Sequence, residues 1–170
     1  MASPLERYRL ADRPLRGSLL DRLIDDDPST LRDPPVDRRE ALAALREALR
    51  RDLELLLNTR CPPVTPPADL EALPESLSCF GTQDFFAAGL ATREEREALA
   101  RALEHQIARF EPRLVDLGVS VMPTRDPAQR MLRLRIQARF TPQPGLPALV
   151  FQTQLDPTTQ RFTVRDADDG

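Results

Sequence analysis

The chain has 170 residues, of which 41% are hydrophobic and 30% are charged, and its formal net charge is −3. This length favours one domain with an arm, and the acidic balance gives no electrostatic support for nucleic-acid binding. No run approaches the roughly 18 apolar residues of a membrane span, and residues 1–10 lack the apolar stretch of a signal peptide, so we expect a cytoplasmic protein.

Residues 1–36 are predicted to form an N-terminal arm that contains a short helix. Leu19, Leu20 and Leu23 would lie on one side of two helical turns, and an aspartate run followed by Pro28 ends the pattern. A helix this short is stable only when it docks on the body of the protein or on a partner. The three leucines are therefore candidate partner-binding residues.

Two helices are predicted, each introduced by a capping-box spacing. Asp37 with Glu40 opens a helix that runs to about Asn58, and Thr92 with Glu95 opens another that runs to Phe110 or Glu111. Apolar residues recur at steps of three and four in both, which indicates one core-facing stripe in each helix. The stripes comprise Leu42, Leu45, Leu49, Leu53 and Leu56 in the first helix and Leu99, Leu103, Ile107 and Phe110 in the second.

The segment between the helices is rich in proline. Residues 61–78 are predicted to be a semi-rigid extended spacer, because prolines recur along it and prevent a helix of any length. Residues 76–81 are predicted to be a short extended piece ended by glycine. Residues 84–88 are predicted to form one helical turn with two buried phenylalanine rings.

Alternating apolar residues predict strands over 115–121, 132–140, 151–155 and 161–165, with turn sequences between the later ones. These strands are expected to form an antiparallel meander. The predicted fold is α+β, with two long helices packed on a mainly antiparallel sheet in a single domain over residues 37–165. An acidic tail, residues 166–170, follows.

The stretch Phe110-Glu111-Pro112-Arg113-Leu114 joins the second helix directly to the first strand. Pro112 cannot extend the helix, and the residue before a proline is pushed away from the α region. Glu111 and Arg113 would then lie side by side. They either pair with each other as a local clasp or present a preorganised guanidinium to a protein partner, and both interpretations stay open.

Arg133, Arg135 and Arg139 share one face of the second strand with Gln137. A solvated outer face is the simpler interpretation. The alternative is a binding stripe for an acidic protein surface. Nucleic acid fits less well, because no aromatic residues interleave the arginines.

The residues give little support for catalysis, a metal or a cofactor. A glycan hydrolase needs two carboxylates beside a cleft that grips sugar, yet the chain has no Trp and one Tyr. His105, the sole histidine, falls on the outer face of its helix, and no glycine-flanked serine elbow or phosphate loop is present. Cys61 and Cys79 lack the histidines that would complete a zinc site. We therefore expect no enzyme activity and no small-molecule substrate.

Several separated pieces resemble the TssE family of type VI secretion baseplate subunits, which is related to the sheath initiators of contractile phages and was once labelled lysozyme-like. The resemblance covers residues 18 to about 165. Its most specific parts are the exit Asn58-Thr59-Arg60, the pair Phe80-Gly81 and the joint Glu111-Pro112-Arg113. It implies a structural protein that links wedge subunits in a cytoplasmic, membrane-docked baseplate, and that offers a sheet on which the contractile sheath begins to assemble.

In that family the Glu-Pro-Arg motif, matched by Glu111, Pro112 and Arg113, is associated with contacts to neighbouring wedge subunits. The other expected partner is the sheath protein, with no insertion into the membrane and no nucleic acid. Two alternatives are a small cytosolic hydrolase acting on glycan and a regulatory adaptor protein.

The last strand is the expected site of sheath attachment. Arg161-Phe162-Thr163-Val164-Arg165 is short, lies at a sheet edge in a meander, and is followed by acidic residues that discourage self-pairing. We expect a sheath subunit to add strands to this edge by β-augmentation.

Overall fold

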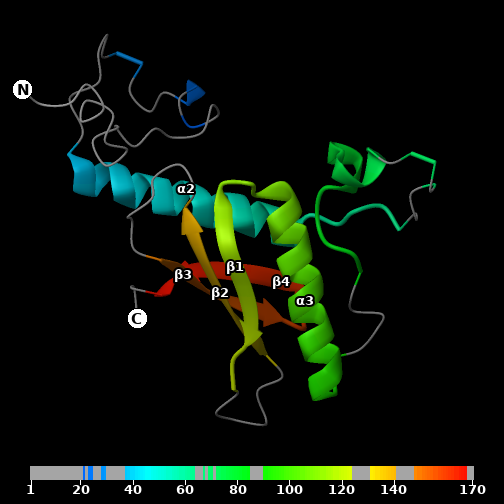
Figure 1. Ribbon diagram of the computed structural model, residues 1–170. Helices are drawn as coiled ribbons and strands as arrows, with labels where there is room; N and C mark the ends of the chain where they lie inside the picture. The colour runs from blue at the N-terminus through cyan, green and yellow to red at the C-terminus, as the bar shows by residue number, and fades with distance from the viewer. Residues whose placement is uncertain are drawn as a thin grey trace, which may run out of the picture.

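The computed structural model describes residues 21, 23–24, 28–29, 37–63, 67, 69–70, 72–84, 90–123, 131–140 and 148–167. Figure 1 shows helices α2 and α3 beside a strongly twisted sheet of strands β1 to β4. The predicted α+β class and antiparallel sheet are confirmed. Within the described residues, no helix has both the length and the apolar character needed to cross a membrane.

Both helices start where their capping boxes predict. Helix α2 spans Arg38–Asn58, and the Asp37 backbone N–H donates to the Glu40 carboxylate over 3.3 Å. Helix α3 spans Arg93–Phe110, and the Thr92 backbone N–H donates to the Glu95 carboxylate over 2.8 Å. These bonds satisfy N–H groups that have no partner within a helix, so each helix has a defined start.

The strands follow one another in space as they do along the chain, in the order β1-β2-β3-β4. They span Leu114–Val121, Leu132–Phe140, Leu149–Asp156 and Arg161–Asp166. This is the predicted meander, with β1 and β4 at the two edges. Strand β4 continues one residue past its expected end, because Asp166 still pairs with Phe151 of β3.

Helices α2 and α3 cover the apolar face of the sheet. In Figure 1, α2 lies above β4 and α3 runs alongside β1. The strictly alternating burial of β2 sends every second side chain into the core and the others outward. The core is aliphatic for the most part and joins all these elements. Its fully buried members include Leu49, Leu53, Leu56, Leu57, Ile107, Leu134, Ile136, Phe151, Leu155 and Phe162.

Strand β1 contains a β-bulge near its start. Val115 pairs with Arg139 and Gly118 pairs with Gln137, so β1 has one residue more than β2 over this interval. Asp116 takes a positive φ of 50° there. The extra residue lets Leu114, before the bulge, and the half-buried Leu117, after it, both contribute to the core.

The prediction for the segment between the helices was partly wrong. Residues 73–75 and 77–79 form two short 3-10 helices, so 76–81 is not an extended piece. Proline excludes a long helix but is well placed in the first turn of a short one, as Pro74 is here. Of the predicted turn at 84–88, all but Asp84 lies outside the described residues.

After these turns the chain returns to the end of α2. Thr82 is 1% exposed, its N–H donates to the Thr59 carbonyl over 2.8 Å, and its own carbonyl accepts from the Cys61 N–H over 3.0 Å. Gly81, just before it, has a φ of 110°, and a Cβ there would lie 2.5 Å from the Thr59 carbonyl oxygen. Only glycine fits at this crossing.

We expect Gly81→Ala to lower the free energy of unfolding by about 1–3 kcal/mol, because it adds both backbone strain and a clash with main chain. Urea titration followed by far-UV circular dichroism would measure the change. Gly118→Ala is the matched control, since a Cβ at Gly118 meets nothing within 4 Å and its φ is not positive. Equal stability of the two variants would show that the crossing can open without cost.

Candidate partner-binding surfaces

The joint between α3 and β1 is a tight turn. The Glu111 N–H donates to the Ile107 carbonyl over 2.8 Å and closes the helix, and the Leu114 N–H donates to the Glu111 carbonyl over 3.0 Å and starts the strand. Pro112 is exposed between them, whereas Glu111 is only 8% exposed. The helix therefore ends where the sequence predicts, and the chain reverses within two residues.

Arg113 lies at the centre of an ion cluster. Its Nε and Nη2 both donate to Glu111 Oε2, over 2.9 and 2.7 Å, and Nη2 also donates to Asp52 Oδ2 of α2 over 2.7 Å. The pairing of Arg113 with Glu111 that the clasp interpretation predicts is present, and the joint's role in binding a partner stays a prediction. Arg113 also reaches a third residue, Asp52, which binds the joint to the other helix.

Burial sets the protonation behaviour of this cluster. Burial raises the pKa of Glu111, and the hydrogen bonds and charge of Arg113 offset only part of that effect. For Arg113, burial lowers the pKa, but the hydrogen bonds to Asp52 and Glu111 outweigh it and the pKa is raised. The guanidinium thus stays charged, and Glu111 depends on it to remain ionised.

The ion pairs continue from the joint to the N-terminal arm. Arg51 Nη2 lies 3.1 Å from Asp52 Oδ1 and 2.7 Å from Asp21 Oδ1. Acidic and basic groups therefore alternate from Glu111 through Arg113, Asp52 and Arg51 to Asp21. This chain of contacts connects the arm to the joint along the surface of α2.

The leucines of the arm are only partly described. Leu19 and Leu20 lie outside the described residues, and Leu23 is 73% exposed. Residues 21 and 23 have helical backbone, but most of the predicted arm helix lies outside the described residues, so it stays a prediction. Leu23 thus presents an apolar side chain to solvent close in sequence to Asp21, which is held on α2.

The outer edge of β4 is occupied by side chains from the end of α2. Asn58 Nδ2 donates to the Phe162 carbonyl over 2.9 Å, and Asn58 Oδ1 accepts from the Phe162 N–H over 2.9 Å. Arg50 donates to the Val164 carbonyl over 3.2 Å. The Asn58 amide thus occupies the Phe162 N–H and carbonyl, which are the two backbone groups that a neighbouring strand would pair with.

The opposite edge, on β1, carries one comparable contact. The Val119 N–H donates to Glu104 Oε2 of α3 over 2.9 Å. The Asn58 carboxamide of α2 therefore hydrogen-bonds to backbone groups at the β4 edge, and the Glu104 carboxylate of α3 hydrogen-bonds to one at the β1 edge. Such side chains protect edges that would otherwise recruit other strands.

Sequence reasoning did not identify Asn58, Asp52 or Glu104 as contributors to these surfaces. Asn58 was noted only as part of the exit Asn58-Thr59-Arg60, with no role assigned. Its partner Phe162 is 104 residues away, and Asp52 is 61 residues from Arg113. One local signal was present, because an uncharged amide at the last position of an amphipathic helix has no place in either its apolar stripe or its charged face.

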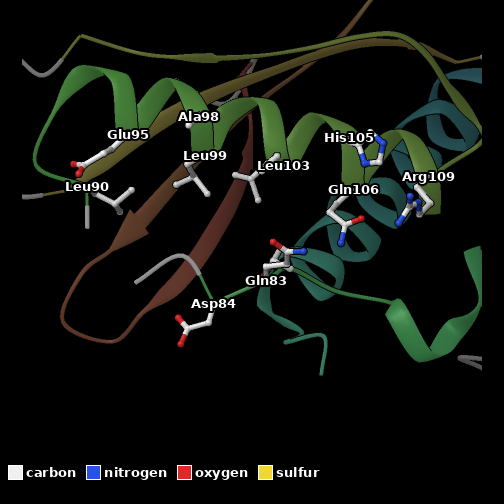
Figure 2. Close-up of a pocket in the computed structure, with 12 residues that line it drawn as sticks. Gln83, Asp84, Leu90, Glu95, Ala98, Leu99, Leu103, His105, Gln106 and Arg109 are labelled. Carbon is white, nitrogen blue, oxygen red and sulfur yellow. The ribbon is translucent and has the colours of Figure 1, made fainter. Parts of the chain in front are cut away.

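A groove of about 570 Å³ runs along α3 (Figure 2). Leu99 and Leu103 point into it, and the Gln106 side chain donates to the Gly81 carbonyl over 2.8 Å. Its two carboxylates are Asp84 and Glu95. Glu95 is bound to the Thr92 N–H, which lowers its pKa, whereas a general acid needs a raised one. Glu95 is therefore poorly suited to act as the general acid of a glycan hydrolase.

The described residues also contain no group of three or more His, Cys, Asp or Glu side chains placed to hold a metal ion. His105 is exposed, as predicted for the outer helix face. The polar contacts of Arg113, Asn58 and Glu104 join the helices to the joint and to the two edges of the sheet.

Comparison with known families shows what the chain is similar to. Residues 43–145 match the family model described as baseplate wedge protein gp25. The matched region runs from α2 through β2 and includes Asp52, Asn58, Glu104 and the joint. No curated protein matches the chain.

We expect Arg113→Ala to lower the free energy of unfolding of the isolated protein by about 2–4 kcal/mol at pH 7. Removal of the guanidinium leaves the buried Glu111 carboxylate without a counter-ion, although the Arg113 and Asp52 side chains are themselves 23% and 20% exposed. Protonation of Glu111 removes this cost, so the loss should be smaller at pH 4 than at pH 7. Urea titrations at the two pH values would measure it.

The stability of the wild type is expected to change with pH in the direction that this argument requires. The pKa of Glu111 is raised in the folded state, so stability from this group is present at low pH and is lost as the pH rises through the folded pKa. Arg101→Ala, at an exposed position of α3, is the control and should change stability by less than about 0.5 kcal/mol. A loss below about 1 kcal/mol for Arg113→Ala would show that the cluster contributes no more than a surface ion pair.

We expect Asn58→Ala to lower the free energy of unfolding by about 1–3 kcal/mol, because it leaves the Phe162 N–H and carbonyl without their partner. Asn58→Asp, which has nearly the same volume, should also destabilise the protein at pH 7, since it places a carboxylate against the Phe162 and Glu54 carbonyls that Nδ2 now binds. Thermal unfolding of both variants would test this. Full stability of Asn58→Asp would mean that Asn58 acts through its volume and not through its hydrogen bonds.

Proposed function

This chain belongs to the baseplate wedge protein gp25 family of structural baseplate proteins, and from that premise we propose that it is the TssE-type subunit of a type VI secretion baseplate. In this role it links wedge subunits and starts assembly of the contractile sheath. It acts by assembly, without catalysis and without a cofactor. It resides in the cytoplasm, in a baseplate docked on the membrane.

The observation that carries this proposal is the family match, which covers the residues of the resemblance that are most specific. Asn58-Thr59-Arg60, Phe80-Gly81 and Glu111-Pro112-Arg113 all lie within 43–145. Each has a distinct contact in the fold, at the β4 edge, at the Thr59 crossing and at the joint. The type VI assignment rests on the order and spacing of these pieces.

Wedge subunits are the proposed partners of the joint. Pro112 is exposed at its tip, and the ion cluster of Glu111, Arg113 and Asp52 holds that tip to both helices. A preorganised tip loses little conformational entropy on docking. The arm leucines Leu19, Leu20 and Leu23 are proposed as a second wedge contact, attached to α2 through Asp21 and Arg51.

The sheath protein is the proposed partner of the strand Arg161-Phe162-Thr163-Val164-Arg165. The side-chain amide of Asn58 makes the two hydrogen bonds to Phe162 that an added strand would make. An incoming strand replaces this amide and extends the ladder along β4, so backbone pairing supplies affinity and the alternation of side chains supplies register. Asn58 then serves as a temporary partner that keeps the edge from aggregating before the sheath arrives.

Hydrogen exchange with the sheath protein of the same secretion system would test this proposal. In the isolated Asn58→Ala variant the Phe162 amide loses its side-chain acceptor and should exchange faster than in the wild type. Addition of sheath protein should protect it again, because the new strand supplies a carbonyl. Amides of the central strand β2 are the internal control and should remain protected throughout.

Protection confined to the helices would overturn the proposed strand addition. Protection at Val119 on β1, without a change at Phe162, would assign the sheath to the opposite edge and contradict the role given to β4. Nearby reading frames for two sheath-like and two large baseplate subunits would support the type VI assignment itself, and their absence would count against it.

A further inference from the structure

The sheet has a second face that neither helix covers. Register places Ser120, Arg135, Gln152 and Arg165 in one row across β1, β2, β3 and β4, and all four are exposed. The neighbouring rows continue this outer face with mostly polar residues, apart from Gly118 and Val150. They contain Gly118, Gln137 and Val150 on one side and Arg133, Gln154 and Thr163 on the other.

The centre of this outer face is basic. Among the described residues, Arg133, Arg135 and Arg165 make no ion pair with a carboxylate. The acids lie toward its margins, where Asp116 pairs with Arg139 and Asp156 stands opposite Arg161. In a chain of net charge −3, three unpaired arginines on one flat face form a local concentration of positive charge.

The shape of the outer face adds a second, independent observation. Gly118 has an ordinary strand φ, and a Cβ built on it meets nothing within 4 Å, so neither the backbone nor the core requires glycine there. With the small Ser120 two residues on, β1 forms a low strip directly beside Arg135 and Gln137 of β2. Glycine inside a strand often marks a place where another backbone approaches closely.

We propose that this outer face binds an extended, acidic segment of a partner protein. The segment lies over the low strip of β1, with its carboxylates on Arg133 and Arg135. These arginines are two residues apart along the strand, about 7 Å, which matches alternate side chains of an extended chain. Arg165 lies two strands across, about 10 Å from Arg135, and adds to the positive potential that attracts the segment.

The chemistry of the outer face favours polypeptide over nucleic acid. Gln137, Gln152 and Gln154 stand among the arginines and can both donate to and accept from peptide groups. No aromatic side chain lies on the described part of this face, since Phe140, Phe151 and Phe162 all point into the core. Single strands of nucleic acid rely on such rings for stacking. The outer face shares Arg165 with the proposed sheath-binding strand, but it uses side chains, whereas backbone groups are proposed to pair at the β4 edge.

Titration of the full-length, isotope-labelled protein with a synthetic peptide of six Glu-Thr repeats, monitored by amide NMR, tests the proposal. Shifts should concentrate at Gly118, Ser120, Arg135 and Gln152. Binding should weaken between about 50 and 300 mM salt, because exposed charges are screened. A Gln-Thr peptide of equal length should bind at least about tenfold more weakly, as loss of several exposed ion pairs predicts.

Two variants and a matched control localise the binding. Arg135→Gln/Arg165→Gln should weaken it about three- to tenfold, whereas Arg38→Gln/Arg101→Gln, which removes the same charge from exposed helix positions, should change it less than about twofold. Gly118→Phe should also weaken binding, because it fills the low strip, while the thermal midpoint stays unchanged.

Equal binding of the two peptides, equal effects of the two double variants, or shifts confined to the helices would each overturn the proposal. Tighter binding of a single-stranded oligonucleotide than of the Glu-Thr peptide would also overturn it and identify a nucleic-acid surface. The peptide contains no baseplate component, so none of these outcomes depends on the proposed function.

Discussion

In the isolated subunit, the hydrogen bonds between the Asn58 side chain and the Phe162 backbone position α2 on the sheet. They fix the end of α2 to the edge of β4, two elements that are 104 residues apart in sequence. The residues that follow use the same place: Thr59 accepts the Thr82 N–H, and Arg60 donates to the Gln160 carbonyl over 3.2 Å. Without these polar contacts, burial of leucines alone would hold α2 on the sheet but would leave its rotation and axial position poorly defined, because apolar packing has little directionality.

The features that could be predicted from sequence are local, and those that could not are contacts between residues far apart in the chain. Capping boxes and apolar periodicity are local, so they gave both helix starts, and strict alternation gave β2 and the order of the meander. The turns at 73–79 were missed because proline forbids a long helix yet suits a single turn. The partners of Arg113 and Asn58 depend on how distant segments meet. For Arg113 only the nearer partner, Glu111, was anticipated, and Asp52 was not.

The two edges of the sheet, the joint and the outer face each have a different physical role. Backbone groups at the edges are held by Asn58, Arg50 and Glu104, so strand pairing is available only to a chain that displaces them. The joint is stiff because a single guanidinium binds two carboxylates from different elements. On the outer face, Arg133, Arg135 and Arg165 make no ion pair within the described residues. A subunit built this way can contact several neighbours at once without one contact distorting another.

The bulge in β1 has a consequence for how the joint tolerates insertions. Strand side chains alternate, so each residue added or removed exchanges the two faces of everything beyond it. The one extra residue at Asp116 corrects this phase between Leu114 and Leu117, so the joint and the rest of β1 can each face the core. Length changes between Arg113 and Gly118 are therefore tolerated only in pairs of residues, or where the bulge itself is gained or lost. Relatives of this protein that keep the bulge should therefore differ in length there by even numbers of residues.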